Sequence, residues 1–562
     1  MPLDNRPQGS TGQERANGAP VRGGARLWLC LLPAALLLPL LDKAFSVDDG
    51  LFVDDARALA RLPADPFAAR VFFGGADFTL GALPHPLGWA SLVALARALL
   101  GESEPALHLL QVLFALLALA ALASLARRFE VSPLAACWLV AGSSAFLAIG
   151  SSVLPYLAWA ALSLAAFDRL VRGVEEGRTT DLLLAGIAAG GAFLCCFAGA
   201  LVIAAQAAYP LFTRRHGLRC WLPLATGVAV AAGYETWSAA VHGAPHFLAT
   251  LHAWSQPFGP GQLANAAADL VQLGGQLPAA WLALGAAALL SRSLAPTVAA
   301  GAVPAVLVLV LHLARPYELP WKAAGAFVAP GAALLAWGLL AGALAARRWL
   351  QRRQERGDPL RLLLALWLLG GTFFSLDYVH VAAKYMLLPL PAAVLLLLDA
   401  WRRVPRGRVR TAALGALVLA QLAVGLLVAW SDDRWAGSYR TFFAADAARW
   451  VSWRGHTFVD ADWGVGLYAE RASLARYHGQ PLAPCDRLLF TDLVPHPFAG
   501  KAILGAAHHV ARLELAYPGP LAVMEAGRAG FYSNGFALVP YRPEARVSDV
   551  VSVLEMPGKG CR

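Results

Sequence analysis

Charged side chains are scarce in this sequence. They make up 15% of its 562 residues, whereas hydrophobic residues make up 58%, and the mean hydropathy is +0.55. A soluble protein of this length cannot bury so much apolar surface, because the buried fraction grows only slowly with chain length. The composition therefore excludes an ordinary soluble protein and predicts one for which lipid is part of the solvent.

Several signatures of known chemistry are also missing. The seven cysteines show no paired spacing of the kind that metal sites use. The polar C-terminal part, 431–562, contains no G-x-G-x-x-G, P-loop, H-E-x-x-H or G-x-S-x-G motif. Almost no charged residue falls in the middle of an apolar run, where an ion-coupled transporter keeps its charges. This last absence disfavours such a transporter.

Apolar runs of spanning length occur throughout the chain up to residue 430. Each spanning helix must satisfy its own backbone hydrogen bonds, so we predict about thirteen spans from apolar length. They are 27–44, 105–126, 133–150, 155–171, 182–195, 198–213, 219–237, 272–291, 295–313, 323–346, 360–376, 386–400 and 411–430. The fifth and sixth are short and are interpreted as a broken pair. Residues 1–25 are predicted to be a disordered cytoplasmic arm.

The basic residues set the predicted orientation. A net charge of +10 would suggest nucleic acid in a soluble protein. Here the cations cluster in short loops, as they do on the cytoplasmic side and where anionic lipids are bound. The basic loops lie at Arg127-Arg128, 169–178, 214–219, Arg292, 347–361 and 402–410. An odd number of spans puts all of them, and the N-terminus, inside, and residues 431–562 outside.

Two polar parts are thus predicted on the outer side of a membrane domain at 26–430. Residues 42–104 form the first outer loop, in which 83–100 is an interfacial helix because Pro84, Pro86 and Arg97 interrupt its apolar run. Residues 431–562 alternate strand-like and helix-like runs, which predicts a small α/β domain. Cys485 and Cys561 lie in that domain and either pair in an oxidising compartment or remain free thiols.

Asp48-Asp49 is the most informative polar cluster. Two adjacent carboxylates next to a spanning helix are costly unless they are hydrated, paired with cations or functional. They suit a general base for an acceptor hydroxyl, or a divalent metal with Asp48 as a ligand. The structural alternative is a solvated loop whose aspartates cap a helix.

Two further clusters lie on the predicted outer side. His85 stands between Pro84 and Pro86, which hold it in extended backbone and suit a metal or a phosphate. Lys384-Tyr385 follows another outer loop, where a cation and a phenol can hold a lipid phosphate. A satisfied lone histidine, a snorkelling lysine and an interfacial tyrosine are the structural alternatives.

The order of several segments resembles a known family. FSVDDGLFVDDARALARLPADPF and PHPLGWASLVALARALLGESEPALHLLQ, then KYMLLPLPAAVLLLLDAW, DADWGVGLYAER and GFYSNGFALVPY, are similar to segments of bacterial family 39 glycosyltransferases. These are GT-C fold enzymes related to protein O-mannosyltransferases and to the lipid A aminoarabinose transferase. The resemblance runs along most of 27–562. It implies transfer of a sugar from a polyprenyl phosphate to a lipid, glycan or protein acceptor on the outer face of the bacterial inner membrane.

The resemblance also implies roles for individual residues. Asp48 matches the family's first acidic position, the base or acceptor-orienting group, and Asp49 matches its neighbour. His85 lies in the proline-flanked segment that forms part of the family's cavity, and Lys384 and Tyr385 match the basic-aromatic pair near the donor phosphate.

The sequence departs from the family at two positions. No acid precedes Pro155 at Val153-Leu154, and no lysine stands near Cys195-Cys196. The missing acid weakens a metal-dependent mechanism, and the missing lysine weakens binding of the donor phosphate. A non-catalytic relative that binds lipid-linked sugars in envelope assembly is therefore the alternative function, with a lipid-linked sugar transporter as a third.

Overall fold

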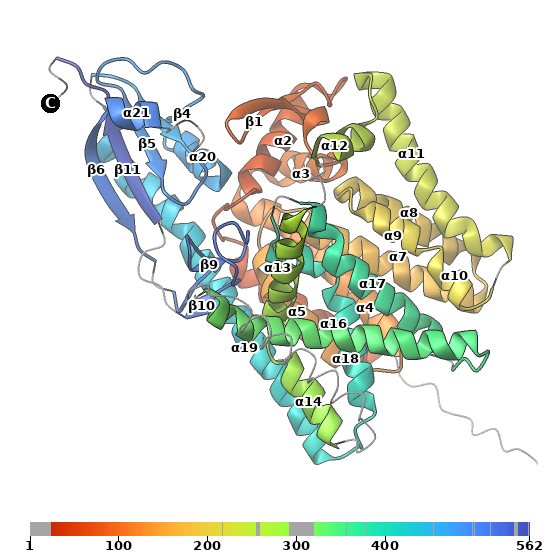
Figure 1. Ribbon diagram of the computed structural model, residues 1–562. Coiled ribbons are helices and arrows are strands. Elements are labelled where there is room, and N and C mark those ends of the chain that lie inside the picture. Colours follow the sequence, from red (N-terminus) through yellow and green to blue (C-terminus); the bar gives the residue numbers. More distant parts are fainter. Residues whose placement is uncertain are drawn as a thin grey trace, which may run out of the picture.

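The computed structural model describes residues 24–562 except 216, 255–258, 291–319, 356, 379, 453, 497, 499–500, 518, 544–548, 560 and 562. The span predicted at 295–313 and nearly all of the arm predicted at 1–25 lie outside the described residues. The described chain is predominantly helical, with a β-sheet near the C-terminus on one side of the helices (Figure 1).

The first half of the chain has a helix near each predicted span. A short helix, α1 (Gly24–Leu31), continues as the 3-10 helix η1 (Leu32–Leu40). Then follow α4 (Glu104–Arg128), α5 (Pro133–Ala141), α6 (Ser144–Gly150), α7 (Tyr156–Glu176), α8 (Thr179–Cys195), α9 (Gly199–Ala205), α10 (Ala208–Phe212) and α11 (Leu222–His242). Helix α4 shows why these segments form helices where the sequence predicts them. It has a proline in its first turn, a long apolar run, and Arg127 and Arg128 at the negative end of its dipole.

Two of the predicted spans are broken. Helices α5 and α6 meet at an angle of 62°, and the Oγ atom of Ser143 caps α6 by accepting from the backbone N–H of Phe146. Helix α8 ends at Cys195 and α9 starts at Gly199, so the break predicted between the fifth and sixth spans is present. A side chain at Gly199 would come within 2.3 Å of the Phe193 backbone nitrogen, so the chain can turn this tightly only with glycine there.

The second half of the chain is also mostly helical. Its helices are α12 (His246–Trp254), α13 (Pro260–Gln276), α14 (Ala280–Leu290), α16 (Pro320–Leu350), α17 (Asp358–Phe373), α18 (Leu390–Arg402) and α19 (Arg408–Thr441). Among the described residues, four helical segments are long and apolar enough to cross a membrane, at 104–128, 324–350, 358–376 and 408–450, and there are five if the bent pair α5–α6 is one span. These apolar helices give the chain the character of a membrane protein; the total of thirteen spans stays a prediction.

Residues 42–104, predicted to be the first outer loop, contain regular structure. Helix α2 (Asp49–Arg61) is followed by a hairpin of β1 (Arg70–Phe73) and β2 (Ala76–Thr79) and by α3 (Leu87–Leu100). Gly74 and Gly75 have positive φ, which a two-residue hairpin turn requires. Helix α3 coincides with the predicted helix at 83–100.

The C-terminal residues form a five-stranded mixed sheet in the order β4-β3-β5-β11-β6. Its strands are β3 (Thr457–Asp460), β4 (Ala475–Arg476), β5 (Arg487–Thr491), β6 (His508–Leu515) and β11 (Asp549–Glu555), with helix α20 (Trp463–Arg471) between β3 and β4. Cys485 and Cys561 form a disulfide. Helix α19 runs through residue 430, so the predicted boundary between the two domains falls inside a helix.

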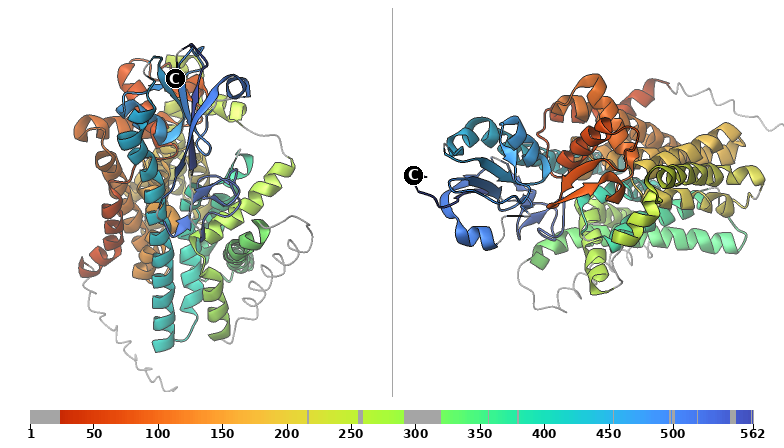
Figure 2. Two further views of the ribbon diagram at one scale, coloured as in Figure 1. Left: turned by 90° about the vertical axis from the view of Figure 1, so that its left-hand side faces the viewer. Right: turned by 90° about the horizontal axis from the view of Figure 1, so that it is seen from above.

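The sheet and the first outer loop are neighbours. Seen from above in Figure 2, the N-terminal elements, coloured red to orange, lie between the blue C-terminal sheet and the yellow helices of the middle of the chain. Helix α2 contacts α20, and the backbone N–H of Gly74 donates to the Asp462 carboxylate at 3.1 Å. The loop that carries Asp48 is therefore held between the sheet region and the helices.

Candidate functional site

Asp48 follows a residue with a strained backbone. Val47, just before it, has φ +45°, which is unusual for a β-branched residue. Such strain costs on the order of 1–3 kcal/mol, and the surrounding contacts must over-determine the conformation for it to persist. The strain turns the chain sharply from η1 into α2, with Asp48 at the N-cap position of α2.

Asp48 forms an ion pair with Lys384. The Nζ atom of Lys384 donates to the Oδ2 atom of Asp48 at 2.6 Å, although the two residues are 336 positions apart in the sequence. Lys384 is buried, and the Asp48 side chain is 20% exposed. Burial raises the pKa of the Asp48 carboxyl, but Lys384, His380 and His85 together outweigh it and hold the pKa below its usual range.

Aromatic rings surround Lys384. The residue lies in the 3-10 turn η5 (Ala383–Leu387), which precedes Pro389 and α18. Its ammonium group lies 5.2 Å from the ring centroid of Tyr156 and 5.6 Å from that of Tyr385, within cation–π range. The hydroxyl of Tyr385 in turn lies 3.3 Å from the Nε2 atom of His380. The Lys384-Tyr385 pair is thus built into a fixed aromatic frame.

His85 lies on the same side of α2 as Asp48. Its ring packs edge-on against Phe52 at 5.3 Å between centroids. Burial lowers the pKa of His85 to about 4, with Asp48 opposing and Lys384 adding to the shift, so the imidazole is neutral at physiological pH. Asp48, His85, Lys384 and Tyr385, four of the five predicted site residues, are therefore brought together from three distant segments.

Asp49 has a different environment from its neighbour. It is fully buried, its Oδ1 atom accepts from the Val153 N–H at 2.6 Å, and its Oδ2 atom accepts from the Ser46 N–H at 2.8 Å. Burial raises the pKa of Asp49 to about 7. Successive residues at a helix start point about 100° apart, which separates the two carboxylates. The Oδ1 atom of Asp49 thus holds α2 against the turn before α7, and the Oδ2 atom fixes the turn that leads into α2.

The two positions at which the sequence departs from the family lie around the same pair. Val153 donates its N–H to Asp49, as above, and the positive charge of Lys384 acts on the thiol of Cys196. Tyr156, whose ring covers Lys384, follows Pro155 in the same turn. The segments 153–156 and 195–196 therefore both belong to the surroundings of Asp48 and Lys384.

Lys43 is a buried residue that sequence reasoning missed. Its Nζ atom pairs with Asp432 at 2.6 Å, and both side chains are completely buried. It also donates to the Ser152 Oγ atom at 2.9 Å and to the Tyr532 hydroxyl at 3.3 Å. Lys43 lies at the end of the span predicted at 27–44 and was not selected from the sequence. The available signal was Tyr532, which lies in the GFYSNGFALVPY segment that resembles the family.

The segment that joins β3 to α20 packs directly on the acidic loop. A side chain at Gly50 would come within 2.3 Å of the Trp463 carbonyl oxygen, and one at Gly464 within 2.1 Å of the Phe45 carbonyl oxygen. The Phe45 N–H donates to the Tyr468 hydroxyl at 2.7 Å. Trp463 has φ +59°, a second strained residue at this junction. The C-terminal region therefore contributes to the position of Asp48.

The arrangement does not form a metal site in the part of the chain that the structure describes. No three His, Cys, Asp or Glu side chains of the described residues are grouped as metal ligands. Asp48 instead has a lysine as its partner, which a cation would have to displace. The divalent metal that the sequence left open stays a prediction, and no step is derived through one.

Comparison with known proteins gives one family match. Residues 84–235 match the model of the family described as dolichyl-phosphate-mannose-protein mannosyltransferase. This range includes His85 and the Val153-Leu154 and Cys195-Cys196 positions, whereas Asp48, Lys384 and Tyr385 lie outside it. No curated protein matches the chain significantly.

Several solved structures of membrane glycosyltransferases are similar to the chain. The oligosaccharyltransferase AglB from Archaeoglobus fulgidus aligns with 13% identity and a TM-score of 0.43, over 82% of this chain and 64% of that chain. ArnT from Cupriavidus metallidurans aligns with 14% identity and a TM-score of 0.41, over 94% and 98% of the two chains. The arabinofuranosyltransferase AftD from Mycobacteria aligns with 16% identity and a TM-score of 0.44, over 95% and 40%. This chain thus spans less than two thirds of AglB.

The family match falls on the segment PHPLGWASLVALARALL and the helices that follow it, which are among the residues on which the resemblance was based. The resemblance of this chain to the GT-C glycosyltransferases related to protein O-mannosyltransferases is therefore confirmed over residues 84–235.

Proposed function

We propose that the protein transfers a sugar from a polyprenyl-phosphate donor to an acceptor hydroxyl on the outer face of the cytoplasmic membrane. The observation that carries this proposal is the ion pair of Asp48 with Lys384, held in a frame of His85, Tyr156 and Tyr385. It joins a candidate base to a candidate phosphate-binding cation, the two groups that this reaction needs.

The donor phosphate would compete with Asp48 for Lys384. A phosphate bound to the Lys384 ammonium takes away the partner that now lowers the Asp48 pKa, whereas the burial that raises this pKa remains. Asp48 then becomes a stronger base. Donor binding would thus activate the base only when there is a sugar to transfer.

The transfer step follows from these roles. The acceptor oxygen forms a bond to the anomeric carbon of the sugar, and the bond from that carbon to the phosphate oxygen breaks. The hydroxyl proton passes to the Asp48 carboxylate, and the polyprenyl phosphate leaves with its charge facing Lys384. The sugar and the acceptor, whether lipid, glycan or protein, are not specified by these residues.

The sidedness of the proposal rests on the basic loops and on the disulfide. Short loops rich in arginine favour the cytoplasmic side. The Cys485–Cys561 disulfide lies in the C-terminal sheet region next to the site, and disulfides persist in oxidising compartments outside the cytoplasm. Both features favour an outward-facing site.

The test is sugar release from a panel of radiolabelled polyprenyl-phosphate sugars by the full-length protein in proteoliposomes. We expect the wild type to consume at least one donor and Asp48→Asn to be slower by at least about 10²-fold. Asp42→Asn is the matched control, because Asp42 lies on the same loop but is 75% exposed. Full turnover by Asp48→Asn, or no donor consumed and none bound, would contradict the proposal.

A second candidate function is a non-catalytic protein that binds the lipid-linked sugar. It is favoured by the absence of an acid at Val153-Leu154 and of a lysine at Cys195-Cys196, both next to the ion pair. Under this alternative the wild type binds a donor without consuming it, and Lys384→Gln loses that binding. Donor binding and donor consumption, measured on the same proteoliposomes, separate the two functions.

A further inference from the structure

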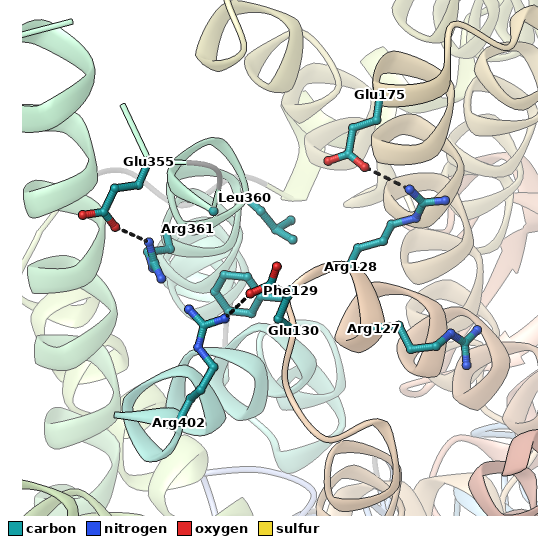
Figure 3. A pocket seen from close by; sticks show the side chains of 10 residues that line it. Arg127, Arg128, Phe129, Glu130, Glu175, Glu355, Leu360, Arg361 and Arg402 are labelled. Atoms are coloured by element: carbon teal, nitrogen blue, oxygen red, sulfur yellow. Dashed lines mark hydrogen bonds and ion pairs between the residues drawn. The ribbon is translucent and has the colours of Figure 1, made fainter. Parts of the chain in front are cut away.

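A polar cavity of about 370 Å³ lies at the far ends of the helices that form the candidate site. Its lining residues are Arg127, Arg128, Phe129, Glu130, Glu175, Glu355, Gly357, Leu360, Arg361 and Arg402. Figure 3 shows Arg128 on α4, Arg361 on α17 and Arg402 on α18 around the cavity, with the Arg127 side chain directed away from them. This volume falls within the range of small-molecule sites.

The cavity and the Asp48–Lys384 pair occupy opposite ends of the same helices. Helix α7 starts at Tyr156, over Lys384, and reaches the cavity at Glu175. Helix α18 starts shortly after Lys384 and ends at Arg402. With a rise of about 1.5 Å per residue, these 21- and 13-residue helices separate the two places by most of a bilayer. The cavity is thus at the predicted cytoplasmic side if the site faces outward.

Buried aspartates and exposed glutamates neutralise the positive charges of the cavity arginines. Behind the cavity wall, Arg361 pairs with Asp358 at 3.1 Å and with Asp399 at 2.9 Å, and both carboxylates are fully buried. These pairs fix the position of Arg361 permanently, because separating them would leave a buried charge.

The remaining partners are glutamates at the cavity rim. Arg128 pairs with Glu175 at 2.9 Å, Arg402 with Glu130 at 2.8 Å, and Arg361 with Glu355 at 3.6 Å (Figure 3). The three glutamate side chains are 43%, 60% and 63% exposed, respectively. Exposed ion pairs of this kind are weak, so these carboxylates can swing into solvent at little cost.

One arginine of the cavity has no carboxylate partner among the described residues. Arg127 forms no ion pair with them, whereas the three nitrogens of Arg128 face Glu175 at 2.9 Å, Glu176 at 2.7 Å and Asp168 at 4.0 Å. The first turn of α17, at Gly357, adds the positive end of a helix dipole to the lining. A dianion would thus meet fixed and free guanidinium groups from several helices, which favour bidentate binding of phosphate.

We propose that this cavity binds a phosphate-bearing anion, with the rim glutamates as placeholders that leave when the anion enters. The phosphate can belong to the head group of an anionic lipid of the inner leaflet or to a soluble phosphate compound. Basic pockets between helix ends on the cytoplasmic side have the chemistry for such head groups. This inference concerns a second site and does not rest on sugar transfer.

The test uses the full-length protein in nanodiscs. In one arm, pyrophosphate binding is measured by calorimetry in phosphatidylcholine nanodiscs. In the other, retention of phosphatidylglycerol over phosphatidylcholine is measured by native mass spectrometry. The test variant is Arg127→Gln/Arg402→Gln, since Arg361 and Arg403 still pair with the buried Asp399, at 2.9 and 3.8 Å, when Arg402 is replaced. Arg408→Gln, an exposed arginine at the same end of the molecule but outside the cavity, is the control.

We expect the double variant to bind at least about tenfold more weakly than the wild type in one of the arms, and Arg408→Gln to bind like the wild type. Glu355→Gln removes a placeholder and should bind more tightly. Binding in the first arm identifies a soluble ligand, and binding only in the second identifies a lipid head group. Equal binding by the wild type and the double variant in both arms, or no binding at all, would overturn the proposal.

Discussion

At the scale of the residue, the protonation of Asp48 depends on one neighbour. Burial alone would raise the pKa of this carboxyl, and Lys384 is the largest of the influences that lower it. A general base works only when it is ionised, so the rate should fall as the pH drops through its pKa. In the wild type this fall belongs at low pH because the pKa is depressed.

Lys384→Gln should therefore change the pH profile as well as the rate. Without the ammonium the effect of burial prevails in the free enzyme, the Asp48 pKa rises, and the acid limb of kcat/KM moves to higher pH. We also expect kcat at neutral pH to fall by at least about tenfold, because the leaving phosphate loses its cation. The measurement is kcat/KM for the donor against pH in proteoliposomes, because this ratio reports the free enzyme, in which Lys384 is paired with Asp48. A profile that drops in height without moving would show that Lys384 does not control Asp48.

Sequence reasoning reached part of this site. Asp48, His85, Lys384 and Tyr385 were selected from local features, such as paired charge, flanking prolines and an aromatic beside a cation, and the fold brings them together. Asp49 differs from Asp48 because its carboxylate accepts a hydrogen bond from Val153. The local sequence cannot reveal this contact, since the two residues are 104 positions apart. His380 and Tyr156 were not selected, because an aromatic residue at a helix end is common in membrane proteins.

At the scale of the element, the junction between the acidic loop and α20 is set by two glycines. Gly50 and Gly464 allow the backbone of the acidic loop to touch the backbone of α20. The atoms nearest to an added Cβ at either glycine are backbone atoms, so a larger residue could be accommodated only by a backbone shift. The DADWGVG stretch resembled the family, but nothing local in it pointed to FSVDDG as its partner. The helix breaks at 142–143 and 195–198, in contrast, occur beside small residues or prolines that can be seen in the sequence.

Gly464→Ala should destabilise the protein and displace Asp48. The new methyl group would lie 2.1 Å from the Phe45 carbonyl oxygen, so one backbone must shift, at a cost of about 1–3 kcal/mol. Sugar transfer should decrease along with the thermal unfolding midpoint in detergent. The control is Gly437→Ala on α19. No atom lies within 4 Å of a Cβ added there, and alanine has a higher helix propensity than glycine. An unchanged midpoint for Gly464→Ala would contradict the close approach.

At the scale of the whole molecule, Lys43 connects the first outer loop to the last long helix and to the C-terminal region. Its partners Asp432, Ser152 and Tyr532 come from three widely separated segments. Tyr532 donates to Asp432 at 2.8 Å, which completes a buried network. Such a network adds a polar tie to the hydrophobic core that the C-terminal region shares with the helices.

Lys43→Met should lower the free energy of unfolding by about 3–5 kcal/mol, since it leaves the buried Asp432 without a cation. Asp432→Leu should have a similar effect, and the double variant Lys43→Met/Asp432→Leu should recover much of the loss. Unfolding in detergent, followed by intrinsic fluorescence, gives the double-mutant cycle. Strictly additive losses would show that the two charges do not act as a pair.

The sequence by itself determined the class of this protein and the positions of most of its helices. Apolar length and basic loops are local properties, and a helix in lipid must satisfy its own hydrogen bonds whatever its neighbours are. Only the tertiary structure decided which charges meet. Lys384 and Lys43 are each buried against one carboxylate, and Arg128, Arg361 and Arg402 gather around one cavity. Charges act over a few ångströms in space, and separation along the chain carries no information about such distances.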